Sequence, residues 1–302
     1  MDKYPSVHIV YTPHDAYFAP QIAQELRGHE RLAFEMVGST DQERGALREA
    51  FNVLTLTEAA DQLAEDPAEL AELEEWASQD YIPATLLHLR RTDAEVNLID
   101  VGSEHPDFSL VQDYERAKEN LFFAFSFGES ELVEKQELVL RALARNVAGR
   151  DKINAHEIHE LTLQDDKGLA VVVGAGHIGL KALLEQQGHD VTTAFISLGE
   201  MPYDIQAQQQ LNSEGAMDPM LVKRALLVEA CNHYRMVDEM LFSQLKSLPT
   251  VYARSTIQEA VQQLDDPAVN ALVESIVSIT SSELGVPDKK QHIAHLLHER
   301  LQ

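Results

Sequence analysis

The chain has 302 residues, 44% of them hydrophobic, and its 50 acidic residues against 24 basic ones give a formal net charge of −26. Such a surface repels phosphate backbones and anionic membranes, so no nucleic-acid partner is expected. The sequence has no run of about 18 apolar residues and no apolar signal segment at its start, which argues against membrane insertion. A single cysteine, Cys231, excludes an internal disulfide framework and a cysteine-rich metal site. These features predict an acidic cytoplasmic protein.

The first two apolar runs predict strands that carry polar residues at or near their ends. Val7 to Tyr11 is followed by Pro13, which cannot continue a ladder of backbone hydrogen bonds, so His14 is expected in the turn after this strand. The second strand, Arg31 to Val37, contains Glu35. A carboxylate in so apolar a strand needs a partner or a task, unless it faces solvent on an edge strand.

The segment up to residue 159 is otherwise mainly helical. The composition predicts one further strand, Glu95 to Val101, and a long helical region from Leu132 to His159 that is interrupted or bent near Gly149. The acidic part of the helix over Thr57 to Gln79 is read as a solvated helix face. The other helices are expected over residues 18–26, 83–91 and 109–125.

One stretch, Gly168 to Val191, organises the rest of the chain. Leu169 to Val173 has the length and apolar character of a strand buried on both faces. A turn of small residues follows, and His177 lies where this turn should become a helix. The next strand is expected over Asp190 to Ile196. His177 is therefore predicted at the carboxyl end of a central strand, where open α/β sheets usually build their sites.

The last third of the chain is expected to be mainly helical. Gly199 to Met217 carries loop signals, and Pro219 to Leu245 is predicted to be a long amphipathic helix. Its apolar positions favour either burial within one subunit or a homodimer through the C-terminal helices; they are Leu221, Ala225, Val228, Met236, Met240 and Leu241. A short strand over Thr250 to Ala253 and three helices over residues 257–264, 267–284 and 287–301 complete the expected elements.

This order of elements predicts an α/β fold. A central, mostly parallel or mixed sheet is flanked by helices, and a C-terminal helical region is added and packed on it. Residues 1–204 would form the core and residues 205–302 the helical extension. Because no linker between them is rich in Gly, Ser or Pro, the two parts are expected to form one continuous domain.

Two turns share one design, an apolar strand followed by a small turn and a histidine. Parallel strands would bring His14 and His177 to the same edge of the sheet, where they could share a metal ion or a substrate. Asp15 or Glu35 could complete a mixed nitrogen and oxygen site for zinc, manganese or cobalt. Alternatively, one histidine could serve as a general base that Glu35 orients. Both could also be loop histidines with hydrogen-bonding roles only.

The order of these motifs resembles that of the TraB/PrgY group, with its relatives the Tiki metalloproteases and the erythromycin-esterase-like hydrolases. The matching positions are Thr12-Pro13-His14, Glu35, Leu98-Ile99-Asp100, Arg150-Asp151 and Gly174-Ala175-Gly176-His177. The resemblance spans roughly the first two-thirds of the chain as short motifs. This chain has Tyr11 where the family usually has glycine, and Val101-Gly102 where it usually has arginine and proline.

The resemblance implies a metal-dependent hydrolase that acts on a peptide or ester bond. His14 and His177 would bind the metal or activate water, Glu35 would bind the metal or move a proton, and Arg150, expected at the start of a helix, would stabilise negative charge. The other implied role is a non-catalytic protein that binds a peptide or a small signal molecule on the same fold. Tyr11, which would crowd the first turn, favours that second role.

A third interpretation uses the same central stretch as a dinucleotide site. Gly174, Gly176 and Gly179 satisfy the G-x-G-x-x-G pattern between a strand and a helix. The strand that follows lacks an acidic residue where the ribose hydroxyl of NAD would be held. The sequence therefore argues against NAD as the cofactor.

Overall fold

The computed structural model describes residues 4–58, 61, 67–127, 131–197, 201–235 and 250–301. These residues fall into two compact units, each formed by two stretches of the chain. The first unit combines Met1–Ser109 with Val147–Ser197, and the second combines Leu110–Asn146 with Leu198–Gln302. The expected division at residue 204 placed residues 110–146 with the core, whereas the structure groups them with the C-terminal helices.

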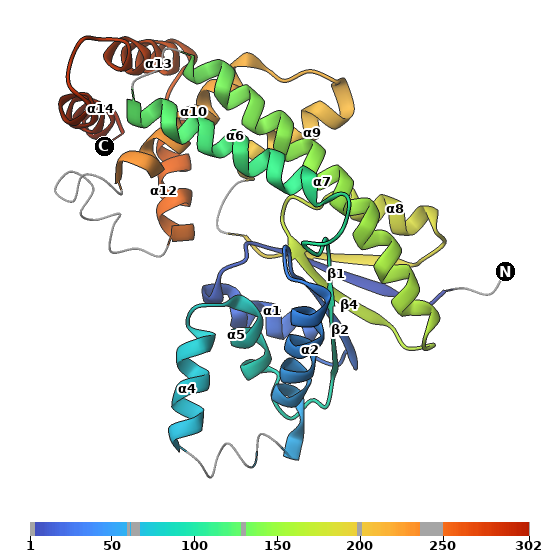
Figure 1. Cartoon of the computed structure of the whole chain (residues 1–302). Helices are drawn as coiled ribbons and strands as arrows, with labels where there is room; N and C mark the ends of the chain where they lie inside the picture. The colour runs from blue at the N-terminus through green and yellow to red at the C-terminus, as the bar shows by residue number, and fades with distance from the viewer. Residues whose placement is uncertain are drawn as a thin grey trace. The chain divides into compact units, whose positions relative to one another are not determined.

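The first unit is built on a five-stranded sheet that is parallel throughout (Figure 1). Its strands, in chain order, are β1 (Val7–Thr12), β2 (Arg31–Glu35), β3 (Glu95–Ile99), β4 (Leu169–Gly174) and β5 (Val191–Phe195). Each coincides, within a few residues, with an apolar run of the sequence. The predicted α/β fold is confirmed, and of the two expected kinds of sheet, mostly parallel or mixed, the structure has a parallel one.

The strand order, β3-β2-β4-β1-β5, places β4 between β2 and β1. The register pairs Val172 of β4 with Val10 of β1 on one side and with Phe34 of β2 on the other. The carboxyl ends of these three strands therefore lie next to one another. Glu35 ends an interior strand and is 4% exposed, so the edge-strand alternative for this residue is wrong.

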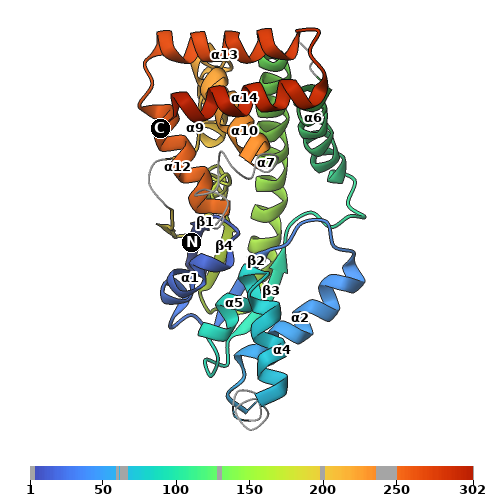
Figure 2. The ribbon, with the colours of Figure 1, turned by 90° about the vertical axis from the view of Figure 1, so that its left-hand side faces the viewer.

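Nearly all residues of β1, β2 and β4 are buried, as expected for strands whose two faces are both covered. On one face, residues of β1, β2 and β4 pack with Ala155 and Ile158 of the long helix α7 (Leu132–Leu163), and with Leu180 and Leu184 of α8 (Leu180–Gln186). The remaining helices of this unit lie together beside the sheet (Figures 1 and 2). They are η1 (Ala16–Phe18), α1 (Ala19–Leu26), α2 (Asp41–Thr55), α4 (Pro67–Ala77) and α5 (Tyr81–His88).

The helix α7 has 32 residues and continues through Gly149 without a break. The predicted interruption at Gly149 is therefore wrong. A glycine in a helix interior costs about 1 kcal/mol relative to alanine, and the packing of Val147, Ala155 and Ile158 on α7 outweighs this cost. Arg150 consequently lies within the helix and does not open one.

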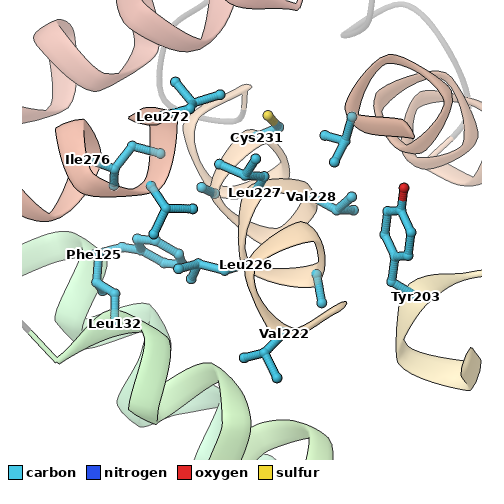
Figure 3. Close-up of a cluster of buried hydrophobic side chains, with 14 of the residues drawn as sticks. Phe125, Leu132, Tyr203, Val222, Leu226, Leu227, Val228, Cys231, Leu272 and Ile276 are labelled. Atoms are coloured by element: carbon cyan, nitrogen blue, oxygen red, sulfur yellow. The ribbon is translucent and has the colours of Figure 1, made fainter. Parts of the chain in front are cut away.

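The second unit is helical in its described residues. Its helices are α6 (Phe108–Phe127), the first half of α7, α9 (Tyr203–Glu214), α10 (Pro219–Arg235), α12 (Thr250–Gln262), α13 (Asp266–Thr280) and α14 (Val286–Arg300). Figure 3 shows side chains of α6, α7, α9 and α13 converging on α10, among them Phe125, Leu132, Tyr203 and Leu272. This core explains why α10 carries so many apolar residues, because Leu221, Ala225 and Val228 are buried within the unit.

Two expectations for this region need correction. Thr250 to Ala253 is not a strand but the start of α12, whose buried residues Ala253, Ile257 and Val261 recur at helical spacing. The predicted loop over Gly199 to Met217 contains α9, which ends at Gly215 in a left-handed conformation. The helix α10 is described to Arg235, and Met236, Met240 and Leu241 lie outside the described residues. Among the described helices, none has the length and apolar character needed to cross a membrane.

Candidate functional site

The candidate site lies where β1, β2 and β4 end. His14 follows β1, Glu35 is the last residue of β2, and the loop after β4 carries His177. Because β4 lies between the other two strands, its loop meets side chains from both neighbours. Gly174 lies at the meeting point, since a Cβ atom there would come within 3.3 Å of Oε2 of Glu35 and 3.6 Å of the His14 ring.

Glu35 is the centre of this cluster, and four polar groups surround its buried carboxylate. Oε1 accepts a hydrogen bond from Nη2 of Arg150 and lies 2.9 Å from Nε2 of His177. Oε2 accepts from the backbone N–H of Gly174 and lies 3.2 Å from Nε2 of His14. A buried carboxylate is stable only when it is paired and hydrogen-bonded, and this one is.

His14 is the solvent-facing member of the cluster, with about a third (34%) of its side chain exposed. Its ring is stacked on that of Tyr81, with ring centroids 4.6 Å apart and planes at 3°. The Tyr81 hydroxyl in turn donates to the backbone carbonyl of Glu35. Desolvation, followed by the positive charges of His177 and Arg150, lowers the pKa of His14 to about 4. His14 is therefore a neutral imidazole at neutral pH.

His177 is buried and lies between two carboxylates. Nδ1 is 2.6 Å from Oδ1 of Asp151, and Nε2 is 2.9 Å from Oε1 of Glu35. The Asp151 carboxylate also leaves no room at Gly179, where a Cβ atom would be 2.6 Å from Oδ2. Both ring nitrogens of His177 are thus fixed by protein groups, whereas Nδ1 of His14 has no hydrogen-bond partner within the described part of the chain.

Arg150 joins Glu35 to a second buried carboxylate, Asp100. Nε of Arg150 lies 3.1 and 3.0 Å from the two oxygens of Asp100, and Nη2 contacts both Asp100 and Glu35. Burial raises the pKa of Asp100, while the charge of His177 and the N–H of Val101 oppose this shift. Burial lowers the pKa of Arg150 to about 10, which leaves the guanidinium charged at neutral pH.

Asp100 adopts a backbone conformation that non-glycine residues rarely use, with φ of 105°. Its backbone is held on both sides: its N–H donates to Oε2 of Glu157, and its carbonyl accepts from Nη1 of Arg44. Strained conformations of this kind persist where surrounding contacts over-determine them, and they cluster at functional sites.

Three of these residues form a group that could hold a metal ion. Glu35, Asp100 and His177 each offer one ligand atom, and these atoms lie within 4.8 Å of one another. Carboxylate oxygens with one imidazole nitrogen suit zinc or manganese. Arg150 already bonds both carboxylates, so a cation here would share them with the guanidinium or displace it. The metal ligands expected from the sequence are His14, His177 and Glu35. They differ from this group in one member, because the group has Asp100 in place of His14.

The loop from Gly174 to Gly179 differs from the expected dinucleotide site. Helix α8 begins at Leu180, with Gly179 as its N-cap, so the helix starts only after the last glycine of the pattern. The N–H of Gly174 donates to Glu35, and Asp151 fills the space at Gly179. Two carboxylates at this loop oppose the approach of a diphosphate.

The structure brings together the four residues proposed as the site from sequence: His14, Glu35, Arg150 and His177. It adds Asp100, Asp151 and Tyr81, which were not proposed as site residues. The signal for Asp100 and Asp151 was present, since both belong to the motifs that resemble the TraB/PrgY pattern. Tyr11 is 1% exposed, and its ring stacks on Phe195 with centroids 4.6 Å apart, so it belongs to the core of the sheet.

No family model matches this chain, and neither a curated protein nor a solved structure is significantly similar to it. The resemblance to the TraB/PrgY group therefore stays a prediction.

Proposed function

We propose that the protein is a hydrolase that acts on a peptide or ester bond, with His14 as the general base that takes a proton from water. The observation that carries this proposal is the contact of 3.2 Å between Nε2 of His14 and Oε2 of Glu35. A carboxylate at one ring nitrogen holds the proton there and leaves the other nitrogen as an acceptor. Here Nδ1 is that acceptor, on a ring that solvent and substrate can reach.

The other members of the cluster support this role by position. Arg150 and the Gly174 N–H hold the Glu35 carboxylate in place, and the Tyr81 ring fixes the plane of His14. The low pKa of His14 keeps the ring unprotonated at neutral pH, as a base must be. His177, with both ring nitrogens engaged, positions Glu35.

A metal-dependent form of the same reaction is a second candidate, because Glu35, Asp100 and His177 lie close enough to bind one ion. A divalent metal there would lower the pKa of bound water and polarise a carbonyl group. Elemental analysis of protein purified without a histidine tag tests this candidate. About one equivalent of zinc, manganese or cobalt, lost in Asp100→Asn, would favour it, and metal-free protein with full turnover would reject it.

The test of the main proposal compares two loop histidines that each follow a strand. His14→Gln should abolish hydrolysis of p-nitrophenyl esters or of a peptide library, while the melting temperature stays close to that of the unchanged protein. His105→Gln, which alters an exposed histidine in the loop after β3, should leave turnover intact. Equal turnover in both variants would contradict the proposal. Binding of a peptide or small molecule without any turnover would instead favour the non-catalytic alternative.

A further inference from the structure

A hollow of about 730 Å³ lies within the second unit, lined by residues of α6, α7, α9, α10 and α12. This volume is typical of sites for small organic molecules. None of its lining residues belongs to the cluster around Glu35, so its role is separate from the proposed hydrolysis.

Aromatic rings form part of the lining. Phe122 and Phe125 both contact the ring of His233, with centroids 4.7 and 5.4 Å apart, and Tyr114 also lines the hollow. Burial and the charge of Lys290 lower the pKa of His233 to about 4, so its ring is neutral at neutral pH. Ring faces of this kind attract cations. One such contact is already present, because Nζ of Lys118 lies 5.1 Å from the Tyr114 centroid.

The charges of the lining are negative on balance. Four carboxylates face only two cations, and the carboxylates belong to Glu115, Glu119, Asp204 and Glu229. Both cations have carboxylate partners: Nη2 of Arg254 lies 3.1 Å from Asp204 and 2.8 Å from Glu229, and Lys118 lies 3.2 Å from Glu115. The lining therefore favours a positively charged ligand over an anion.

Buried hydrogen-bond acceptors without partners add a second, independent feature. Gln136 is 1% exposed, and its Oε1 has no hydrogen-bond partner among the described residues; the same holds for the buried Oδ1 of Asn232. Both residues line the hollow. Leaving a buried acceptor unpaired is unfavourable, because the group has lost its water without gaining another partner. A rotation of either side chain toward the hollow would let an N–H group of a ligand pair with its oxygen and recover that cost.

We propose that this hollow binds a small hydrophobic ammonium compound. Its apolar body would pack against Phe122, Phe125 and His233. Its N–H groups would donate to Gln136 and Asn232, and the surplus of carboxylates would balance its charge. The ring faces and the negative charge of the lining favour a cation over an anion. The unpaired acceptors favour a compound that carries N–H groups.

The test uses 2-phenylethylammonium as the probe and the full chain as the protein. Isothermal titration calorimetry is suitable because the single tryptophan, Trp76, lies in α4 of the other unit and does not report on the hollow. We expect saturable 1:1 binding with a Kd below about 1 mM. The anion 3-phenylpropionate has a similar aromatic body and should bind at least about tenfold more weakly.

Two variants separate the parts of the proposal. Gln136→Leu removes an orphaned acceptor, so amine binding should weaken while the free protein melts at the same or a higher temperature. Phe122→Ala, at a side chain that is 55% exposed, should weaken binding with little effect on stability. Leu138→Ala is the matched control, because Leu138 is exposed on α7 and does not line the hollow.

The proposal is overturned if the amine shows no saturable binding, or if 3-phenylpropionate binds as tightly. It is also overturned if neither Gln136→Leu nor Phe122→Ala changes the amine affinity relative to Leu138→Ala.

Discussion

Asp151 holds His177 through one carboxylate oxygen, at 2.6 Å from Nδ1, and its other oxygen reaches the space beside Gly179. Asp151 lies on α7 and His177 in the loop after β4, so this contact fixes the loop to the helix. The loop conformation therefore depends on the absence of a side chain at position 179.

Gly179→Ala should lower the stability of the protein by about 1–3 kcal/mol, because the new Cβ would lie 2.6 Å from Oδ2 of Asp151 and one of the two must move. Urea denaturation followed by circular dichroism measures the change. Gly45→Ala is the matched control: Gly45 lies inside α2 with nothing within 4 Å of the added Cβ. That substitution should raise stability by about 0.5–1 kcal/mol. Equal effects at the two glycines would contradict the tight fit at Gly179.

Arg150→Ala should cost about 3–5 kcal/mol of unfolding free energy, because it leaves the buried carboxylates of Glu35 and Asp100 without their shared cation. Arg116→Ala provides the comparison, since Arg116 forms an exposed pair with Asp113 on α6. Surface pairs contribute little, so this variant should unfold like the original protein. Chemical denaturation of both variants decides the point, and a mild loss in Arg150→Ala would show that the two carboxylates do not depend on the guanidinium.

The pH dependence should follow the low pKa of His14. If His14 is the base, kcat/KM stays constant as the pH falls from neutrality and declines with a midpoint near 4. Stability has a related profile: between the ordinary value of 6.5 and about 4, the unfolded chain binds a proton at His14 more readily than the folded one. The original protein should thus lose stability relative to His14→Gln as the pH falls through this window. Parallel stability curves would refute the shift.

Glu35→Gln should lower kcat/KM by at least about 100-fold, as expected for losing a positioned acid–base partner. The amide keeps the volume but offers one acceptor oxygen in place of two, and its NH2 group must face either His14 or the Arg150 side of the cluster. Far-ultraviolet circular dichroism should stay the same, with a lower melting temperature because a buried ion pair is lost. Turnover equal to that of the original protein would remove Glu35 from the mechanism.

The five strands and the meeting of His14, Glu35 and His177 could be predicted from the sequence for one physical reason. Short apolar runs indicate strands buried on both faces, such strands are usually parallel, and their carboxyl ends share an edge. The sequence does not encode the strand order as simply. That β4 lies between β1 and β2 depends on long-range pairing, and this order is what brings all three side chains to one carboxylate.

Some features of the site depend on three-dimensional geometry that the sequence pattern does not predict. The positive φ of Asp100 cannot be predicted from its residue type, because this conformation is usually adopted by glycine. Arg150 and Asp151 are consecutive on a helix, about 100° apart around its axis, and helical periodicity does not predict that both reach the same cluster. The stacking of Tyr81 on His14 joins residues 67 positions apart and has no local signature.

The predicted helix boundaries are wrong where tertiary packing outweighs the local helix propensity of the sequence. Gly149 reads as a break, and the β-branched start of Thr250 to Ala253 reads as a strand, yet both segments are helical because their buried residues recur at helical spacing. The start of α4 at Pro67 agrees with the sequence, because proline favours the first turn of a helix.

The helix α7 has a practical consequence for dividing the chain into fragments. Its first half belongs to the helical unit and its second half, with Arg150 and Asp151, to the unit that holds the sheet. A fragment ending at residue 197 would retain α6 and all of α7 but lose α10 and α13, against which Phe125 and Leu132 pack. Such a fragment would expose apolar surface and aggregate. Domain-dissection experiments should therefore remove residues 110–146 together with the C-terminal helices, or keep both.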